Sequence, residues 1–119
     1  MMYQTHSSKV IEINIKNYKR KKFYSDSLVT NLRGITLGVL TADCVPIILY
    51  DKSQRMIGCI HAGWKGSIRG IIEKTLKKFQ RKDMKKNLIA CVGPCIGKKS
   101  YEVSYDFKKK FIRETKKNN

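Results

Sequence analysis

The chain has 119 residues, of which 41% are hydrophobic, and it carries 26 Lys and Arg against 9 Asp and Glu. This length suits one small domain, residues 1–119, and no apolar run reaches the ~20 residues that a membrane-spanning helix needs. The first residues, MMYQTHSSKV, lack the apolar core of a secretory signal. We therefore expect a cytoplasmic protein, no membrane association, and four reduced cysteines.

The formal net charge of +17 raises the question of a polyanionic partner. Lysine far outnumbers arginine, which is the better residue for bidentate recognition of phosphates and bases. The lysines are spread through KNYKRKK, KTLKKFQRKDMKK and FKKKF, without a recognisable nucleic-acid motif. We expect solvated lysine surfaces and no specific nucleic-acid partner.

The N-terminal third of the chain is predicted to form strands. Residues 9–17 (KVIEINIKN) alternate apolar and polar side chains, which indicates a strand. Residues 18–25 are basic and polar and predict a loop. A short strand is expected at 27–31, and the apolar run at 35–40 (ITLGVL) predicts a buried strand.

The next segment has the pattern of a β-hairpin. Residues 45–51 (VPIILYD) and 55–61 (RMIGCIH) are two apolar runs joined by the polar turn DKSQ. Pro46 falls at the start of its strand, where a missing N–H is tolerated. Cys59 alternates within the second strand and is expected to be a small core residue.

The C-terminal half combines helices with one strand. A helix is expected from Ser67, capped by Gly66 or Ser67, because its apolar residues fall at helical spacing. A strand at 87–94 with Cys91 inward and a helix within 101–114 complete the domain. Helix and strand together predict an α/β or α+β fold. The residues expected to face inward are Ile68, Ile71, Ile72, Leu76 and Phe79 on the first helix, and Phe107, Phe111 and Ile112 on the second.

Both histidines of the chain and one cysteine form the candidate chemical site: His6, Cys44 and His61. Thiolate and imidazole are ligands that zinc prefers, and a set of three leaves a fourth position for water or substrate, as in catalytic sites. Cys44 and His61 fall at the ends of predicted strands, where a scaffold exposes reactive groups. The sequence therefore predicts a zinc site.

The same residues allow two other interpretations. Cys44 can be a small core residue, and each histidine a hydrogen-bonded structural residue. Alternatively, Cys44 is a nucleophile, His61 its base and Asp43 the residue that orients the base. Neighbouring residues on a strand point to opposite faces, however, so Asp43 is badly placed for that role.

The turn AGWKGS, which follows His61, supplies a candidate anion site. Gly63 and Gly66 let the backbone come close to a ligand. The N–H groups at the start of the following helix favour an anion such as phosphate.

Five segments occur in a fixed order along the chain: QTHS (4–7), SDSLVT (25–30), TADCVPIILYD (41–51), IGCIHAGWKGS (57–67) and VGPCIGKKSYEV (92–103). Together they resemble the laccase-domain family of YfiH-type proteins, which are also labelled polyphenol oxidases and are now regarded as purine nucleoside phosphorylases. The resemblance implies an α+β fold with mixed β-sheets packed together and helices outside.

The resemblance implies a cytoplasmic enzyme that binds zinc through His6, Cys44 and His61, with Cys44 and His61 at the catalytic centre. Family members convert adenosine, inosine, guanosine and methylthioadenosine with phosphate to the base and pentose 1-phosphate, and they deaminate adenosine. Copper-dependent phenol oxidation has been ascribed to some members. Two histidines are too few for several coppers, although one copper at the zinc site is compatible with its affinity.

The neighbouring residues suit this chemistry. The Lys65 ammonium and the turn from Gly63 to Ser67 are expected to hold phosphate. Trp64 or Tyr101 is expected to stack on the purine, and Trp64 alternatively packs under the turn. Glu102 is expected to accept a hydrogen bond from ribose or base, or only to fix its loop.

The sequence also departs from the family pattern. Family members are about twice as long, so the fold is expected to be incomplete at both ends and His6 to lie on a frayed terminus. GWKG replaces the usual Gly-Trp-Arg-Gly, and lysine offers a point charge where arginine offers a fork. These departures leave open an inactive remnant or basic binding module, or a second chain that supplies the missing segments.

Overall fold

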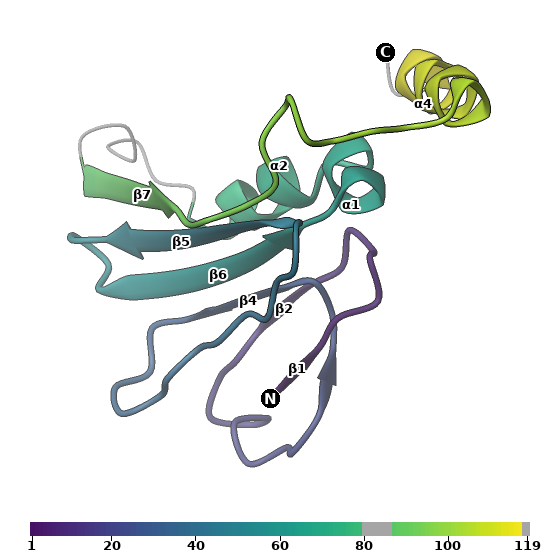
Figure 1. The fold of residues 1–119 in the computed structure, drawn as a ribbon. Helices are drawn as coiled ribbons and strands as arrows, with labels where there is room; N and C mark the ends of the chain where they lie inside the picture. Colours follow the sequence, from purple (N-terminus) through teal and green to yellow (C-terminus); the bar gives the residue numbers. More distant parts are fainter. Residues whose placement is uncertain (80–86, 118–119) are drawn as a thin grey trace.

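The computed structural model describes residues 1–79 and 87–117 (Figure 1). Its main feature is a five-stranded sheet with the order β2-β4-β6-β5-β7. β2 runs parallel to β4, and the other neighbours are antiparallel, so the sheet is mixed and the fold is α+β, as predicted. The strands are β2 (Val10–Glu12), β4 (Ser27–Thr30), β5 (Val45–Asp51), β6 (Met56–Ala62) and β7 (Leu88–Val92).

The predicted hairpin is confirmed as β5 and β6, which pair along their whole length. The buried Asp51 carboxylate shapes the turn, because it accepts hydrogen bonds from the backbone N–H groups of Ser53 and Gln54 at 2.8 and 2.9 Å. At the other end of the hairpin, Pro46 lies opposite His61. The hairpin therefore brings Cys44, which directly precedes β5, close to the last residues of β6.

The helix after β6 is broken into three short pieces, where the sequence predicts one helix. α1 (Trp64–Ile68) and α2 (Ile71–Leu76) are separated at Gly70, and α2 passes into a 3₁₀ turn, η1 (Lys77–Phe79). Gly70 has a φ of 76°, a left-handed conformation that glycine adopts without a steric penalty and that ends a helix.

The predicted start of this helix is wrong by one turn. Gly63 is the residue that precedes α1, and its carbonyl accepts hydrogen bonds from both the backbone N–H and the hydroxyl of Ser67. Ser67 and Gly66 therefore lie inside α1 and do not cap it. The helix starts earlier because Gly63 is the only residue between the end of β6 at Ala62 and the start of α1 at Trp64.

Alternation along the strands divides the apolar side chains between two clusters, one on each face of the sheet. Figure 1 shows α1 and α2 against one face, and the small parallel pair of β1 (Met2–Tyr3) and β3 (Phe23–Tyr24) lies below the other end of the sheet. The cluster under the helices contains Val29, Leu49, Met56, Ile60, Ala62, Ile71 and Phe79. The cluster on the opposite face contains Met2, Ile13, Phe23, Leu28 and Cys59.

Three predictions for the N-terminal region need correction. The strand expected at 9–17 is only β2, because a turn begins at Asn14, whose backbone N–H donates to the Asn17 side chain. The loop expected at 18–25 contains β3. Residues 35–40 form no strand; they cross the second cluster, which takes up Leu37 and Val39.

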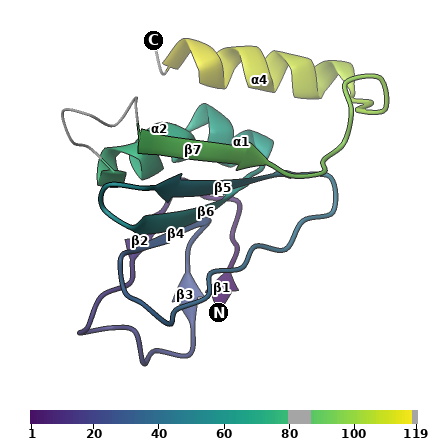
Figure 2. The same cartoon turned by 90° about the vertical axis from the view of Figure 1, so that its left-hand side faces the viewer.

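The C-terminal helix α4 (Tyr105–Lys117) lies at the end of the molecule furthest from β1 and β3 in both views (Figures 1 and 2). Phe107 is half-buried, as predicted, but Phe111 and Ile112 are 40% and 45% exposed because α4 covers no sheet face. None of the described helices combines the length and apolar character that crossing a bilayer requires. The lysine-rich segment 80–86 lies outside the described residues.

The edge strand β7 also differs from its prediction. Cys91 is exposed, because the face of the sheet formed here by Ile48, Tyr50 and Ile89 has no covering layer among the described residues. All four cysteines are free thiols, and Cys59 is buried as expected.

Gly58 gives a test of the packing between β6 and the helical layer. A Cβ at this position would lie 3.0 Å from Cζ of Phe79 and 3.2 Å from Cγ1 of Val29, in the middle of the cluster under the helices. We expect Gly58→Ala to lower the free energy of unfolding by about 1–3 kcal/mol, measured by urea denaturation. Gly38→Ala, which would meet nothing within 4 Å, is the control; equal stability losses in both variants would contradict this packing.

Candidate metal centre

The structure brings His6, Cys44 and His61 together, and we refer to these three residues as the triad. Their ligand atoms all lie within 4.8 Å of one another, and Cys44 Sγ is 4.0 Å from His6 Nε2. Cys44 directly precedes β5, His61 lies at the end of β6, and His6 comes from the N-terminal loop. The antiparallel register of the hairpin places the first two side by side, although they are far apart in sequence.

This donor set fits a zinc ion. Two ligands on a tetrahedral zinc lie about 3.5 Å apart, so separations of up to 4.8 Å need to shrink by at most about 1.3 Å. Within the described residues, no other group of three or more histidine, cysteine or carboxylate side chains is gathered in this way. The chain therefore offers two imidazoles and one thiol to a single ion.

The buried carboxylate of Asp26 orients His61. Its Oδ1 lies 2.9 Å from Nδ1 of His61, and both side chains are almost fully buried. Such a bond places the imidazole proton on Nδ1, and Nε2 is then left as the atom that can bind a metal. The orienting residue is thus Asp26, and the structure gives no support to Asp43 in that role.

Asp26 also holds the segment that carries His6. Its two oxygens accept hydrogen bonds from the backbone N–H groups of Thr5, His6 and Ser7 at 2.7–3.2 Å, and from the Ser7 hydroxyl. Backbone donors converging on one carboxylate impose the turn in which His6 has a φ of 54°. The expectation of a frayed His6 is therefore wrong, because this segment is tied to the sheet.

The hydrogen bonds also keep Asp26 ionised. Burial by itself raises the pKa of this carboxyl group, but the bonds from His61, Ser7 and Thr5 outweigh it and lower the pKa to about 2. Asp26 is therefore an anion throughout the neutral range and balances positive charge at the triad.

Cys44 is not a pre-activated nucleophile. Burial raises the pKa of its thiol, and the negative charges of Asp43 and Asp26 raise it further. A thiol in this environment stays protonated near neutral pH unless a cation binds beside it. This favours Cys44 as a metal ligand over the alternative in which it attacks a substrate.

Gly63 forms the wall of the triad. A Cβ at this position would lie 3.1 Å from Cys44 Sγ, 3.1 Å from Cδ2 of His6 and 3.8 Å from Cε1 of His61. Its φ of −76° is open to any residue, so the requirement for glycine here is one of space. Gly66 has a similar role, since its Cβ would lie 2.7 Å from the Ser7 carbonyl oxygen. The two glycines of the turn let the N-terminal loop approach α1.

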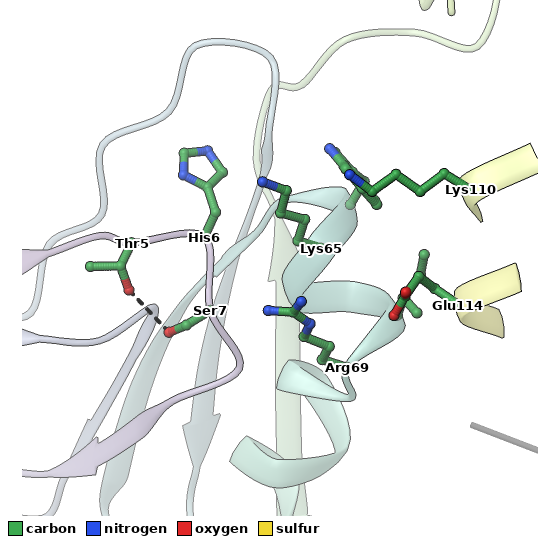
Figure 3. A pocket seen from close by; sticks show the side chains of 9 residues that line it. Thr5, His6, Ser7, Lys65, Arg69, Lys110 and Glu114 are labelled. Carbon is green, nitrogen blue, oxygen red and sulfur yellow. Dashed lines mark hydrogen bonds between the residues drawn. The ribbon is translucent and has the colours of Figure 1, made fainter. Parts of the chain in front are cut away.

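Two hollows adjoin the triad. The cationic hollow, of about 250 Å³, opens beside His6, and in Figure 3 the ends of Lys65 and Arg69 turn toward the N-terminal loop while Lys110 reaches in from α4. Its lining consists of Thr5, His6, Ser7, Trp64, Lys65, Ile68, Arg69, Lys110 and Glu114.

The apolar hollow, of about 400 Å³, opens beside Cys44. Trp64 lines both hollows, and its ring also packs edge-on against Phe107 with centroids 4.8 Å apart, so the packing alternative for Trp64 holds as well. The lining of the apolar hollow consists of Asp43, Cys44, Val45, Ala62, Gly63, Trp64, Ser67, Ile96, Lys98 and Tyr101.

Of the substrate-binding residues predicted from the sequence, some line the two hollows and one lies outside them. Lys65 lines the cationic hollow, and Tyr101 lines the apolar hollow. Glu102 is exposed and lies outside both, and its backbone N–H donates to the Ser100 carbonyl. Sequence reasoning missed Asp26, Arg69 and Lys110 as site residues. The segment SDSLVT pointed to the region of Asp26, but nothing in it indicated that the carboxylate bonds two other segments of the chain, the N-terminal loop and the end of β6.

The whole chain, residues 1–119, matches the family described as multi-copper polyphenol oxidoreductase laccase. The chain belongs to this family. A purine nucleoside phosphorylase of Haemophilus influenzae is 37% identical to this laccase-family chain over 109 residues, which are 92% of the chain and 43% of that relative. One from Aquifex aeolicus is 40% identical over 116 residues, which are 98% of the chain and 54% of the relative.

Solved structures share the fold of this laccase-family chain. The Bacillus licheniformis hypothetical protein YfiH has a TM-score of 0.77 at 29% identity, over 92% of the chain and 44% of the YfiH chain. YlmD from Geobacillus stearothermophilus has a TM-score of 0.76 at 24% identity and covers 93% of the chain and 43% of its own. The chain thus spans about half the length of the relatives it matches.

Asp26 provides a test that separates stability from metal binding. We expect Asp26→Asn to lower the free energy of unfolding by about 2 kcal/mol and zinc affinity by about 10–100-fold, because His61 and the His6 segment both lose their anchor. Isothermal titration with zinc and urea denaturation measure the two effects. Asp51→Asn is the matched control, since this buried carboxylate lies at the far end of the hairpin and should leave zinc affinity unchanged. Unaltered zinc affinity in Asp26→Asn would contradict the anchoring role.

Gly63 tests the space between the ligands. In Gly63→Ala, the added methyl group should push Cys44 and His6 apart and weaken zinc binding by about tenfold, while far-ultraviolet circular dichroism stays that of the wild type. Gly97→Ala, where a Cβ would meet nothing within 4 Å, should bind zinc normally. Normal zinc binding by both variants would show that the ligand atoms do not close on one ion as arranged here.

Proposed function

We propose that this chain binds zinc through His6, Cys44 and His61 and takes part in purine nucleoside phosphorolysis, with adenosine deamination as a second activity. The observation that supports this most directly is the convergence of the three ligands, with Asp26 behind His61, between two hollows of opposite character. The relatives named purine nucleoside phosphorylase supply the reaction class. The substrates expected are adenosine, inosine, guanosine and methylthioadenosine.

The reaction has two substrates, and the chain offers two hollows. Phosphorolysis forms a bond between a phosphate oxygen and the anomeric carbon of ribose. It breaks the bond from that carbon to the purine nitrogen, and the purine leaves with a proton. A polar anion and a flat apolar base therefore have to be held on either side of one sugar carbon. The cationic hollow and the apolar hollow, which share Trp64, match these two requirements.

The chain's own residues have separable roles. Lys65 faces the phosphate, and Trp64 and Tyr101 bound the space for the purine ring. Asp26 keeps the proton on Nδ1 of His61, so this imidazole does not lose its orientation when charge develops nearby. When bound, zinc would supply Lewis-acid polarisation of a substrate oxygen or of water. Copper is a second ion that this donor set accepts.

A matched pair of cysteine variants tests the proposal. We expect Cys44→Ala to lose bound zinc, measured by elemental analysis, and to lose release of hypoxanthine from inosine in the presence of phosphate. Cys91→Ala is the control, because Cys91 is an exposed thiol on β7 and should retain both. Inosine phosphorolysis at the wild-type rate by metal-free Cys44→Ala would overturn the proposal.

A wild-type chain with neither zinc nor turnover would favour the non-enzymatic alternative. The proposal would then apply only to an assembly with a second polypeptide that supplies further segments. Mixing the purified chain with such a segment and repeating both measurements would decide between these possibilities.

A further inference from the structure

The cationic hollow is built from three parts of the chain that are distant in sequence. Lys65 and Arg69 project from α1 and from the residue after it, one helical turn apart, and Lys110 projects from α4. Figure 3 shows Lys110 facing Lys65 across the space, with the His6 segment forming the opposite wall. Three cations thus line one hollow of about 250 Å³ that contains a single carboxylate, that of Glu114.

Two of these cations are held against one aromatic ring. Nζ of Lys65 lies 5.6 Å and Nζ of Lys110 5.8 Å from the centroid of the Trp64 ring. The negative face of the ring attracts each ammonium group. Trp64 thereby keeps two positive charges at the cationic hollow, where an anion can be attracted to both.

The two hydroxyl groups of the hollow already have hydrogen-bond partners. Thr5 Oγ1 donates to Ser7 Oγ at 3.1 Å (Figure 3). The Ser7 hydroxyl donates to Asp26 at 2.7 Å, and Thr5 Oγ1 also lies 3.1 Å from Asp26. The positive side chains are therefore better placed than these hydroxyls to hold the oxygens of an anion. Arg69 is the one among them that can grip two phosphate oxygens at once, because its guanidinium is a planar fork.

We propose that Arg69 and Lys110 join Lys65 in a phosphate subsite beside His6, so that α4 supplies one wall of the site. This inference rests on the proposed function, since the phosphate is the attacking substrate of the phosphorolysis. Arg69 supplies the bidentate contact that the lysine at position 65 cannot make. The edge contact between Phe107 and Trp64 positions α4 so that Lys110 reaches the hollow.

Binding of inorganic phosphate to the full chain tests this subsite without requiring turnover or bound zinc. Isothermal titration at low ionic strength should show saturable binding by the wild type. Arg69→Gln and Lys110→Gln should each weaken it by about tenfold or more, as expected for loss of a charge-assisted contact. Arg69→Lys should restore only part of the affinity, because a point charge replaces the fork.

Lys108→Gln is the matched control for general electrostatic attraction. It removes the same charge from the same helix, but Lys108 does not line the hollow, so phosphate affinity should change by about twofold or less. An equal loss in Lys108→Gln and Lys110→Gln would overturn the subsite. So would unchanged binding in Arg69→Gln, or wild-type binding weaker than about 10 mM.

The two proposals fail separately. If zinc and base release are found in the wild type, and Arg69→Gln leaves both the phosphate affinity and the KM for phosphate unchanged, the subsite is wrong and the function stands. If phosphate binds with the expected dependence on Arg69 and Lys110, but the chain retains no zinc and releases no base, the subsite stands and the function is wrong.

Discussion

The carboxylate of Asp26 is the interaction on which the candidate site depends. Asp26 directly precedes β4, and its carboxylate accepts hydrogen bonds from the N-terminal loop and from His61 near the end of β6. One ionised group thereby fixes the position of two of the three triad residues. The third, Cys44, follows from the hairpin register alone. Because the carboxylate is fully buried, its hydrogen bonds are protected from water and the geometry does not rely on surface contacts.

The two glycines of the turn after His61 add a constraint of a different kind. At Gly63 and Gly66 the chain has no side chain because other parts of the molecule occupy that space: the triad in one case and the Ser7 carbonyl in the other. Hydrogen bonds to Asp26 therefore hold the N-terminal loop, and the lack of side chains at Gly63 and Gly66 leaves the space that the loop needs beside α1. Both conditions have to be met before His6 can lie beside Cys44.

Local patterns predicted the fold correctly where apolar runs are bounded by polar turn residues. The two apolar runs around DKSQ predicted the hairpin and hence the approach of Cys44 to His61, and the family motifs identified His6 as their partner. The patterns failed where contacts distant in sequence decide the outcome. Residues 35–40 are as apolar as a strand but cover the second cluster, and Cys91 alternates like a core residue although its face of β7 is uncovered. Arg69 and Lys110 could not be linked from sequence, since tertiary packing such as that of Phe107 on Trp64 brings α4 to the hollow.

The uncovered apolar surface along β5 and β7 has a consequence for how the chain behaves in solution. Ile48 and Tyr50 on β5 and Ile89 on β7 present exposed hydrophobic side chains, and β7 has no further partner strand among the described residues, a combination that favours association between copies. The net charge of +17 opposes such association by mutual repulsion, which acts over roughly 10 Å at moderate ionic strength. Repulsion between the lysines is therefore expected to oppose association through this surface, and to do so less as the salt concentration rises.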